Sequence, residues 1–142
     1  MAQSRLMSIN SRSKGQRNER AVVNYIQEYC GINAERNHSQ TAKGGHDLLG
    51  VPFYAVEVKA YARYTDADRI KWWDQAVRQA KVAELEPAVW FRANRQDWQV
   101  MIAHPQALAD KIFDLEDFRV VQTMHAELWC ALLNERVAAD GS

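Results

Sequence analysis

Residues 47–59 read DLLGVPFYAVEVK, and this stretch predicts a β-hairpin that ends at a charged site. Its second strand, residues 53–58, is rich in β-branched and aromatic residues. Because successive side chains of a strand alternate between its faces, Glu57 and Lys59 share one face and point toward the end of the hairpin that carries Asp47. The expected elements are a strand ending at Leu48-Leu49, a turn at Gly50-Val51-Pro52 and a strand from Phe53 to Val58.

Two carboxylates and an ammonium group at one end of a hairpin predict a divalent-metal site with a cation beside it. Asp47 and Glu57 are suitable ligands for Mg²⁺, which binds carboxylate oxygens, carbonyl groups such as that of Val58, and water. The metal lowers the pKa of bound water and neutralises charge on a scissile phosphate. Lys59 can orient the attacking water and stabilise developing negative charge. This pattern therefore indicates hydrolysis of a phosphodiester.

A helix is expected from Ser13, its N-cap, to about Tyr29, with Cys30-Gly31 ending it. Glu19 lies on the same side of this helix as the apolar residues, so its carboxylate needs a partner, which a metal ion or an arginine supplies. The alternative is a first-turn glutamate that interacts with the helix dipole. We expect Glu19 to join the metal site directly or through water. The apolar stripe of the helix consists of Val22, Val23, Ile26 and Tyr29.

The order of these residues resembles the motif of the PD-(D/E)xK nuclease superfamily. The wider pattern resembles the archaeal-type Holliday-junction resolvases and their phage relatives, and it covers about residues 12–100. His46 stands where the superfamily motif has proline, a position that shapes the turn. The resemblance implies a restriction-endonuclease-like α/β fold in which a central mixed β-sheet is flanked by helices. The pattern comprises residues 13–20, Arg36…Ser39, Gly44-Gly45-His46-Asp47, Glu57-Val58-Lys59 and Gln75.

The resemblance also implies roles for individual residues and a cofactor. The cofactor is Mg²⁺, for which Mn²⁺ substitutes. Gln75 follows on the next helix, where many relatives carry a glutamine close to the site, and Gln79 is its rival one turn later. Outside such a pattern, Asp47 would be a turn residue and Glu57 and Lys59 a salt bridge. The implied catalytic residues are Glu19, Asp47, Glu57, Lys59 and Gln75, and the implied metal ligands are Glu19, Asp47, Glu57 and Val58.

The charges of the chain are unevenly distributed although its formal net charge is zero. Residues 1–43 carry seven Lys/Arg against three acids, and residues 97–142 carry three against eight. This asymmetry indicates one phosphate-seeking side, and chance scatter of surface charge is the alternative. For the loop histidines His38 and His46, contact with phosphate and simple exposure to solvent both stay open. The expected DNA-binding residues are Arg12, Lys14, Arg17, Arg20, Arg36, Ser39 and Lys43.

At 142 residues the chain is long enough for one domain with a substantial core. We expect a flexible basic N-terminal arm over residues 1–12 and a single nuclease domain over residues 13–142. No apolar run approaches the roughly 18 residues that span a bilayer, and no secretory signal is visible. Cys30 and Cys130 are expected to be reduced and structural. Together these features predict a protein of the cytoplasm, in a prokaryote or a phage-infected host.

The rest of the chain predicts further strands and helices. A short strand is expected from Ile32 to Arg36. A helix starts at Thr65-Asp66-Ala67-Asp68 and runs to about Leu85, with Ile70, Trp73, Val77 and Ala80 facing inward. Two strands, Pro87–Arg92 and Trp98–Ile102, surround a turn, and the chain beyond Pro105 is expected to be mostly helical. Its apolar stripe is Met124, Leu128, Leu132 and Val137, widened by Trp129 and Leu133.

These observations predict a metal-dependent, structure-selective DNA endonuclease, with a four-way junction as the favoured substrate and DNA recombination or repair as its setting. A flap, a replication fork or a duplex site are alternative substrates, and an inactive DNA-binding protein of the same fold is the alternative class. Because a four-way junction needs two symmetric cuts, we expect a homodimer. The apolar surface offered for the dimer is Trp72 and the Met124–Leu128–Leu132 stripe with Trp129, although that stripe can equally be core.

Overall fold

The structure is a computed structural model that describes the backbone of residues 2–38 and 45–141, and the side chains of residues 13–38 and 45–141. It contains a six-stranded sheet in the order β1-β2-β3-β4-β5-β6. All neighbouring strands are antiparallel except β3 and β4, which are parallel. The expected α/β fold with a central mixed sheet is therefore confirmed. The strands are β1 (Glu35–Arg36), β2 (Leu48–Leu49), β3 (Tyr54–Tyr61), β4 (Glu86–Ala93), β5 (Gln99–Ala103) and β6 (Val121–His125).

Helix α2 (Asp66–Ala83) makes the crossover between the two parallel strands. Thr65 caps its first turn, because its side chain accepts a hydrogen bond from the amide of Asp68 while the Asp68 carboxylate accepts one from the amide of Thr65. The helix ends at Glu84, whose φ of 58° turns the chain back toward the sheet. The parallel pairing places the carboxyl ends of β3 and β4 side by side, with Tyr61 opposite Ala93.

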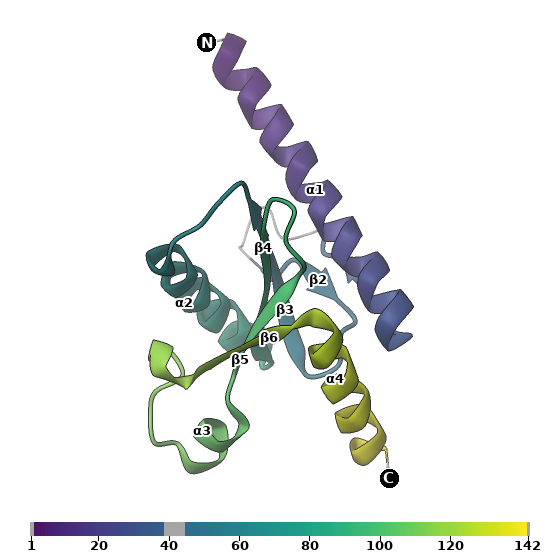
Figure 1. Ribbon diagram of the computed structural model, residues 1–142, viewed down its shortest axis with the longest axis vertical. Helices are drawn as coiled ribbons and strands as arrows, with labels where there is room; N and C mark the ends of the chain where they lie inside the picture. The colour runs from purple at the N-terminus through teal and green to yellow at the C-terminus, as the bar shows by residue number, and fades with distance from the viewer. Residues whose placement is uncertain (1, 39–44, 142) are drawn as a thin grey trace.

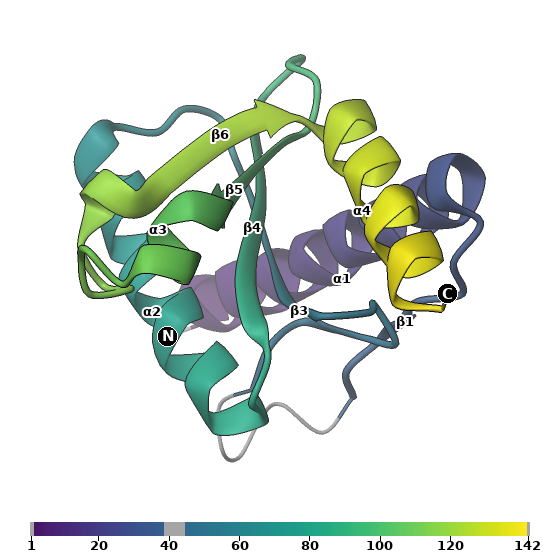
Figure 2. The same ribbon diagram turned by 90° about the horizontal axis from the view of Figure 1, so that it is seen from below.

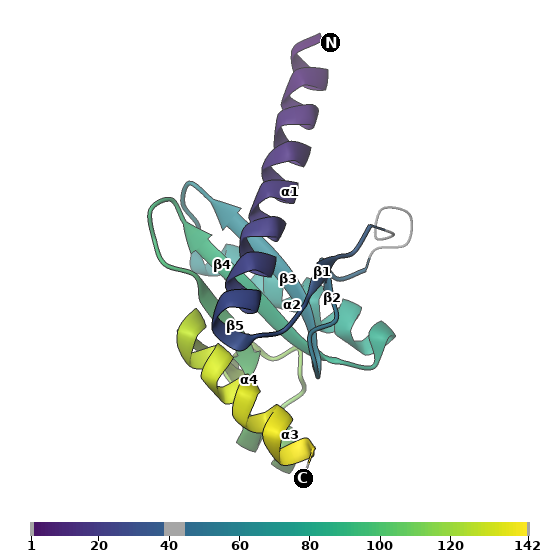
Figure 3. The ribbon, with the colours of Figure 1, turned by 90° about the vertical axis from the view of Figure 1, so that its right-hand side faces the viewer.

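Helices cover both faces of the sheet (Figures 1 and 2). Helices α1 (Ala2–Cys30) and α4 (Ala126–Asp140) lie on one face, and α2 lies on the other together with the segment that contains α3 (Pro105–Asp110) and the 3₁₀ turn η1 (Phe118–Val120). Figure 3 shows α1 and α4 in front of the sheet and the N-terminal part of α1 projecting beyond it. Alternation along β4 divides the core, because Trp90 packs toward α1 and α4 whereas Val89 and Phe91 pack toward α2.

Several helix predictions are corrected at their ends and on their faces. Helix α1 begins at Ala2 instead of Ser13. Residues 2–12 contain no glycine or proline, so nothing in them stops the helix. The division of the chain at residue 12 stays a prediction. Tyr29 and Ile70, expected to face inward, are 46% and 48% exposed.

Trp72 is buried, which overturns its proposed place in a dimer surface. Tyr61 stacks on the Trp72 ring with centroids 5.5 Å apart, and Tyr64 and Phe91 complete an aromatic cluster around it. The neighbouring Trp73 is buried in the core between α2 and the sheet. Its indole N–H donates to the carbonyl of Leu115. Both tryptophans are therefore core residues, since β3 and the segment after it cover the side of α2 that a single helical stripe leaves open.

The C-terminal region contains a strand that the sequence pattern did not indicate. Strand β6 buries only Met124, so alternation of apolar and polar residues is too weak there to predict a strand. Helix α4 follows directly, with His125 as its N-cap. Its inward face is Ala126, Trp129, Cys130 and Leu133, whereas Leu128 and Leu132 are exposed.

Cys30 and Cys130, a hundred positions apart, come together where the end of α1 packs on α4. Both are buried, their thiols are free, and the two side chains are within hydrogen-bonding distance. Within residues 2–38 and 45–141, no helix is both long and apolar enough to cross a membrane.

Candidate active site

Asp47 is fixed beside β3 by backbone and side-chain hydrogen bonds. Its amide donates to the carbonyl of Val56 (2.9 Å), which continues the pairing of β2 with β3. Its carboxylate Oδ2 accepts the amide N–H of Val58 (2.8 Å), a donor at the point where the pairing with β2 stops. The amide of Asn37 donates to the Asp47 carbonyl (2.8 Å). The hairpin thus holds this carboxylate against the strand that carries Glu57 and Lys59, as the sequence predicted.

Glu57 is almost completely buried and lies against Asp47. Its side chain is 3% exposed and forms a hydrogen bond with the Asp47 carboxylate. Burial is the largest cause that raises the pKa of Glu57, the negative charge of Asp47 adds to it, and Lys59 opposes it. Two carboxyl groups this close bind a proton or a cation between them. Carboxylate oxygens and the adjacent Val58 carbonyl are the ligands that Mg²⁺ prefers, so these residues fit a divalent ion.

Glu19 approaches the same site from α1, across a pocket of about 460 Å³. The Nε of Arg36 on β1 donates to the Glu19 carboxylate at 3.0 Å. Burial and the charge of Asp47 raise the pKa of Glu19, while Arg36 lowers it. Of the two partners expected for Glu19, a metal ion or an arginine, the structure thus contains the arginine. The pocket is lined by Lys14, Gly15, Asn18, Glu19, Asp47, Val58, Lys59, Ala60 and Tyr61.

Metal-ligand geometry at this site is limited to the Asp47–Glu57 pair. Within the described ranges, no three His, Cys, Asp or Glu side chains come together closely enough to hold a metal ion. The Glu19 carboxylate forms an ion pair with Arg36 instead. A role for Glu19 through a bridging water fits this geometry better than direct ligation.

Two glutamines of α2 contact the active-site strand at different residues. The ammonium group of Lys59 donates to the side-chain oxygen of Gln75 at 3.1 Å. One turn later, Gln79 donates to the Glu57 carboxylate and to the Gly45 carbonyl when its amide nitrogen faces them. The sequence left the choice between Gln75 and Gln79 open, and the structure brings both to the site, one beside the cation and one beside a carboxylate.

The expected DNA-binding residues do not gather in one place. Lys14 and Arg17 are exposed on α1 and line the pockets beside the site. Arg20 is exposed but lines none of these pockets, and Arg36 is engaged with Glu19. The residues whose side chains lie outside the described ones are Arg12, Ser39 and Lys43.

The two loop histidines differ in their surroundings. His38 is exposed, while His46 is half-buried beside Asp47. Burial lowers the pKa of His46, against the opposing charge of Asp47. The carbonyl of His46 accepts a hydrogen bond from the side chain of Asn37 (3.0 Å), so the backbone at the usual proline position is held in place.

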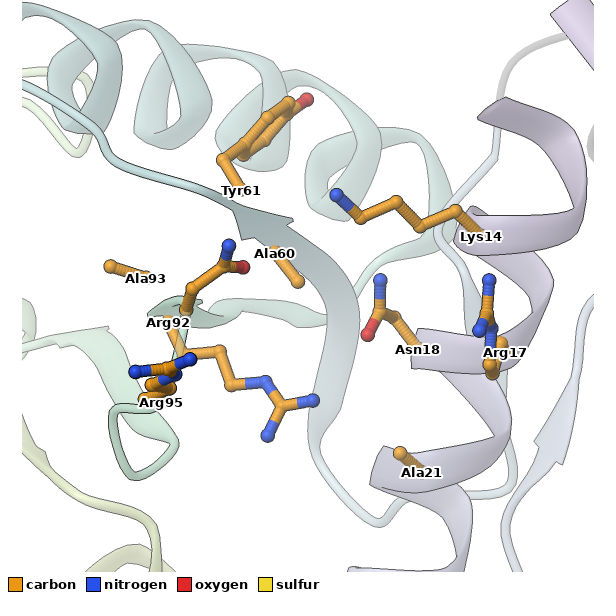
Figure 4. A pocket seen from close by; sticks show the side chains of 10 residues that line it. Lys14, Arg17, Asn18, Ala21, Ala60, Tyr61, Arg92, Ala93 and Arg95 are labelled. Carbon is orange, nitrogen blue, oxygen red and sulfur yellow. The ribbon is translucent and has the colours of Figure 1, made fainter. Parts of the chain in front are cut away.

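A second pocket, of about 390 Å³, adjoins the first and contains residues that the sequence analysis missed. Arg92 at the end of β4, Arg95 in the following turn and Tyr61 at the end of β3 line it together with Lys14 and Arg17 (Figure 4). The two arginines lie in no periodic pattern or motif, so only the folded chain shows that they line one pocket with residues of α1.

Comparison with known proteins places the chain among nucleases of phage origin. A model of the family described as "Phage putative PDDEXK endonuclease" matches residues 10–128, most of the chain. The chain is 26% identical to Protein D14 of Escherichia phage T5, over 75% of this chain and 79% of that protein. It is also similar to the solved structure of Hjc from Archaeoglobus fulgidus, a Holliday junction resolvase from an archaeal hyperthermophile. That match has a TM-score of 0.44 and 25% identity, and it covers 61% of this chain and 70% of the other.

Proposed function

This chain belongs to the phage PDDEXK endonuclease family, and from that premise we propose that it is a Mg²⁺-dependent DNA endonuclease that resolves four-way junctions. Nucleases of this type generally use divalent metal ions. The observation that carries the proposal is the buried Asp47–Glu57 pair with Lys59 two residues further along the same strand. A degenerate, inactive domain would have no use for two carboxylates whose burial opposes their charge.

We assign the roles from the contacts of each side chain. Asp47, Glu57 and the Val58 carbonyl would hold the metal, and Glu19 would bind a water of its shell. When bound, Mg²⁺ or Mn²⁺ supplies a water of lowered pKa and neutralises charge on the scissile phosphate. Lys59 orients the attacking water and stabilises negative charge that develops on the phosphate. Gln75 positions Lys59 through their 3.1 Å hydrogen bond, and Gln79 positions Glu57.

A four-way junction is favoured over a flap, a fork or a duplex site by the resemblance in the sequence, from the 13–20 segment to Gln75. Two symmetric cuts require two copies of this site, so the proposal includes a homodimer. With Trp72, Met124 and Trp129 buried, the apolar surface for it is reduced to Leu128 (51% exposed) and Leu132 (43% exposed) on α4. Membership of a phage family supports activity in an infected host cell.

The test is cleavage of a labelled four-way junction, run beside flap, fork and duplex substrates with Mg²⁺, Mn²⁺ or EDTA. We expect paired cuts in the junction that need the metal. Asp66→Asn, at an exposed position at the start of α2, is the matched control for Asp47→Asn. Equal cutting of junction and duplex would make the protein a nuclease without structural selectivity. Binding without cutting of any substrate would support the inactive DNA-binding alternative.

The homodimer is tested separately by sedimentation of the protein alone and on junction DNA. Leu128→Glu with Leu132→Glu should yield monomers that nick one strand at a time, because charge on this face opposes its burial. A wild-type protein that sediments as a monomer in both conditions would remove the dimer and most of the case for paired cutting.

A further inference from the structure

The pocket of about 390 Å³ lies between α1 and the carboxyl ends of β3 and β4. Figure 4 shows Lys14 extending from α1 toward β3, and Arg92 extending from the opposite wall toward α1. Arg17 adds a third cation from α1, and Arg95 adds a fourth from the turn between β4 and β5. Among the described residues, no acidic one lines this pocket, so four positive charges surround one hollow.

None of these four cations pairs with an acidic side chain in the part of the chain that the structure describes. Five other arginines of the described residues are neutralised by carboxylates, and the exposed Arg20 and Arg63, which are not, line neither pocket, so this pocket is where unpaired cations gather. The formal net charge of the chain is zero, so the unpaired charge here is a local feature and does not reflect a basic protein. The paired arginines are Arg36 with Glu19, Arg69 with Asp66, Arg78 with Asp74, Arg119 with Asp117 and Arg136 with Glu86.

The cationic pocket is continuous with the active-site pocket. Lys14, Asn18, Ala60 and Tyr61 line both, so the two hollows share a wall along the end of β3. The parallel pairing of β3 with β4 brings this about, because Lys59 lies opposite Phe91 and the next residues, Ala60 and Arg92, begin the second pocket. A strand of DNA leaving the active site along this edge therefore enters the cationic pocket.

Arg92 is held in place before any ligand binds. Its guanidinium lies 4.5 Å from the centre of the Trp98 ring, which is itself buried. Arg95 sits in the turn with a φ of 66°, and the amide of Gln96 donates to the Ala93 carbonyl at 3.1 Å to close that turn. Guanidinium groups donate several hydrogen bonds in a planar fork that matches phosphate oxygens, so a prepositioned arginine loses less entropy on binding.

We infer that this pocket binds the phosphodiester backbone of the DNA segment next to the scissile phosphate, with Arg92 and Arg95 as contacts. The inference rests on the proposed function and deepens it. The lining of the active-site pocket balances Glu19 and Asp47 against Lys14 and Lys59, whereas the cationic pocket carries four cations, so the cationic pocket supplies much of the metal-free affinity. It also determines the side of the active site on which the DNA continues.

The test compares metal-free binding of junction DNA, followed by fluorescence anisotropy over a range of salt concentrations. Arg92→Gln/Arg95→Gln should weaken binding about tenfold or more and make the negative slope of log K against log[salt] shallower by about 0.9 for each lost contact. Arg92→Lys/Arg95→Lys keeps the charge and should retain most of the slope. The matched control is Lys111→Gln/Arg119→Gln, which removes two exposed cations near α3 and should leave the slope unchanged. Equal slopes for wild type and the Arg92/Arg95 variant would overturn the inference.

Neutral methylphosphonate linkages, placed one at a time along the DNA, test which phosphates the pocket contacts. Linkages close to the cut on one side should weaken binding by the wild type but not by Arg92→Gln/Arg95→Gln, because the contact is already lost. Losses of equal size in both proteins would overturn the inference. Since Arg92 packs on Trp98, Arg95→Gln alone is measured as well, and an unchanged melting temperature shows that its effect is not unfolding.

Failure of this inference and failure of the proposed function give different results. The binding assay needs neither metal nor cleavage. A shallower salt dependence of Arg92→Gln/Arg95→Gln, together with a wild type that cuts no substrate, would therefore support the pocket and refute the nuclease. Junction cleavage by the wild type, together with a salt dependence that the Arg92/Arg95 substitutions leave unchanged, would support the nuclease and refute DNA binding by the pocket.

Discussion

The active-site pocket and the cationic pocket share a wall, yet their charges are arranged in opposite ways. In the first, Asp47 and Glu57 are buried against each other and Glu19 is bound to Arg36. In the second, Lys14, Arg17 and Arg95 are exposed, Arg92 is half-buried against Trp98, and none of the four has an acidic partner among the described residues. Close contacts between like charges oppose folding, but they provide the ligands for catalysis. Cations near the surface contribute little to the free energy of unfolding, but they raise the affinity for DNA. Substitutions in the two pockets should therefore affect different measurements.

The largest effect is expected from the carboxylates. Asp47→Asn or Glu57→Gln should lower the cleavage rate about a thousandfold or more, since a metal ligand supports several kcal/mol of transition-state stabilisation. Junction affinity without metal should stay the same or rise, because one negative charge is removed. Single-turnover cleavage and anisotropy measure the two effects. Full activity of either variant would show that the metal is bound elsewhere.

Substitution of Lys59 should have the second-largest effect on the cleavage rate. Lys59→Ala removes the cation beside the nucleophile and should slow cleavage by about a hundredfold to a thousandfold, with little change in DNA affinity. Gln75→Ala, which only releases the Lys59 ammonium group, should have a smaller effect, and Lys111→Ala is the control on a distant surface. A loss of only about tenfold for Lys59→Ala would limit Lys59 to a structural role.

The cations of α1 should affect binding and not the chemical step. Lys14→Gln with Arg17→Gln should weaken junction binding and flatten its salt dependence by about 0.9 in slope for each contact, as measured by anisotropy. Arg20→Gln, also on α1 but outside both pockets, is the matched control. If Arg20→Gln alone lowered the slope, the DNA would lie on another face of α1.

The smallest expected effect is on the pH dependence of stability. In metal-free protein, the pKa of Glu57 is raised from 4.5 to about 9, so between these values the folded state keeps a proton that the unfolded chain has lost. The free energy of unfolding should therefore fall as pH rises through this window, by about 1–3 kcal/mol between pH 5 and 8. Denaturant titrations in EDTA measure this fall. Glu57→Gln should flatten it, whereas Glu35→Gln, at an exposed position, should not. A wild-type protein equally stable at both pH values would contradict this prediction.

Local patterns predicted the hairpin and α2 correctly, because alternation and capping depend on neighbouring residues. The spacing of Asp47, Glu57 and Lys59 needed only a strand with two faces, and the structure places all three at one site. The capping box at Thr65 and Asp68 formed as expected. Weak alternation hid β6, and the absence of a stop signal extended α1 to Ala2.

The sequence by itself determined the position of the carboxylates and the lysine, which follows from strand alternation, and the mixed α/β fold, which followed from the resemblance of an ordered motif to a known superfamily. Only the tertiary structure showed that Arg36 is the partner of Glu19, that Gln75 contacts Lys59 while Gln79 contacts Glu57, and that Trp72 is buried. The cationic pocket also belongs to this second group. Its residues come from α1, β3, β4 and the turn after β4, and no local pattern encodes the crossover through α2 that brings the ends of β3 and β4 together beside α1.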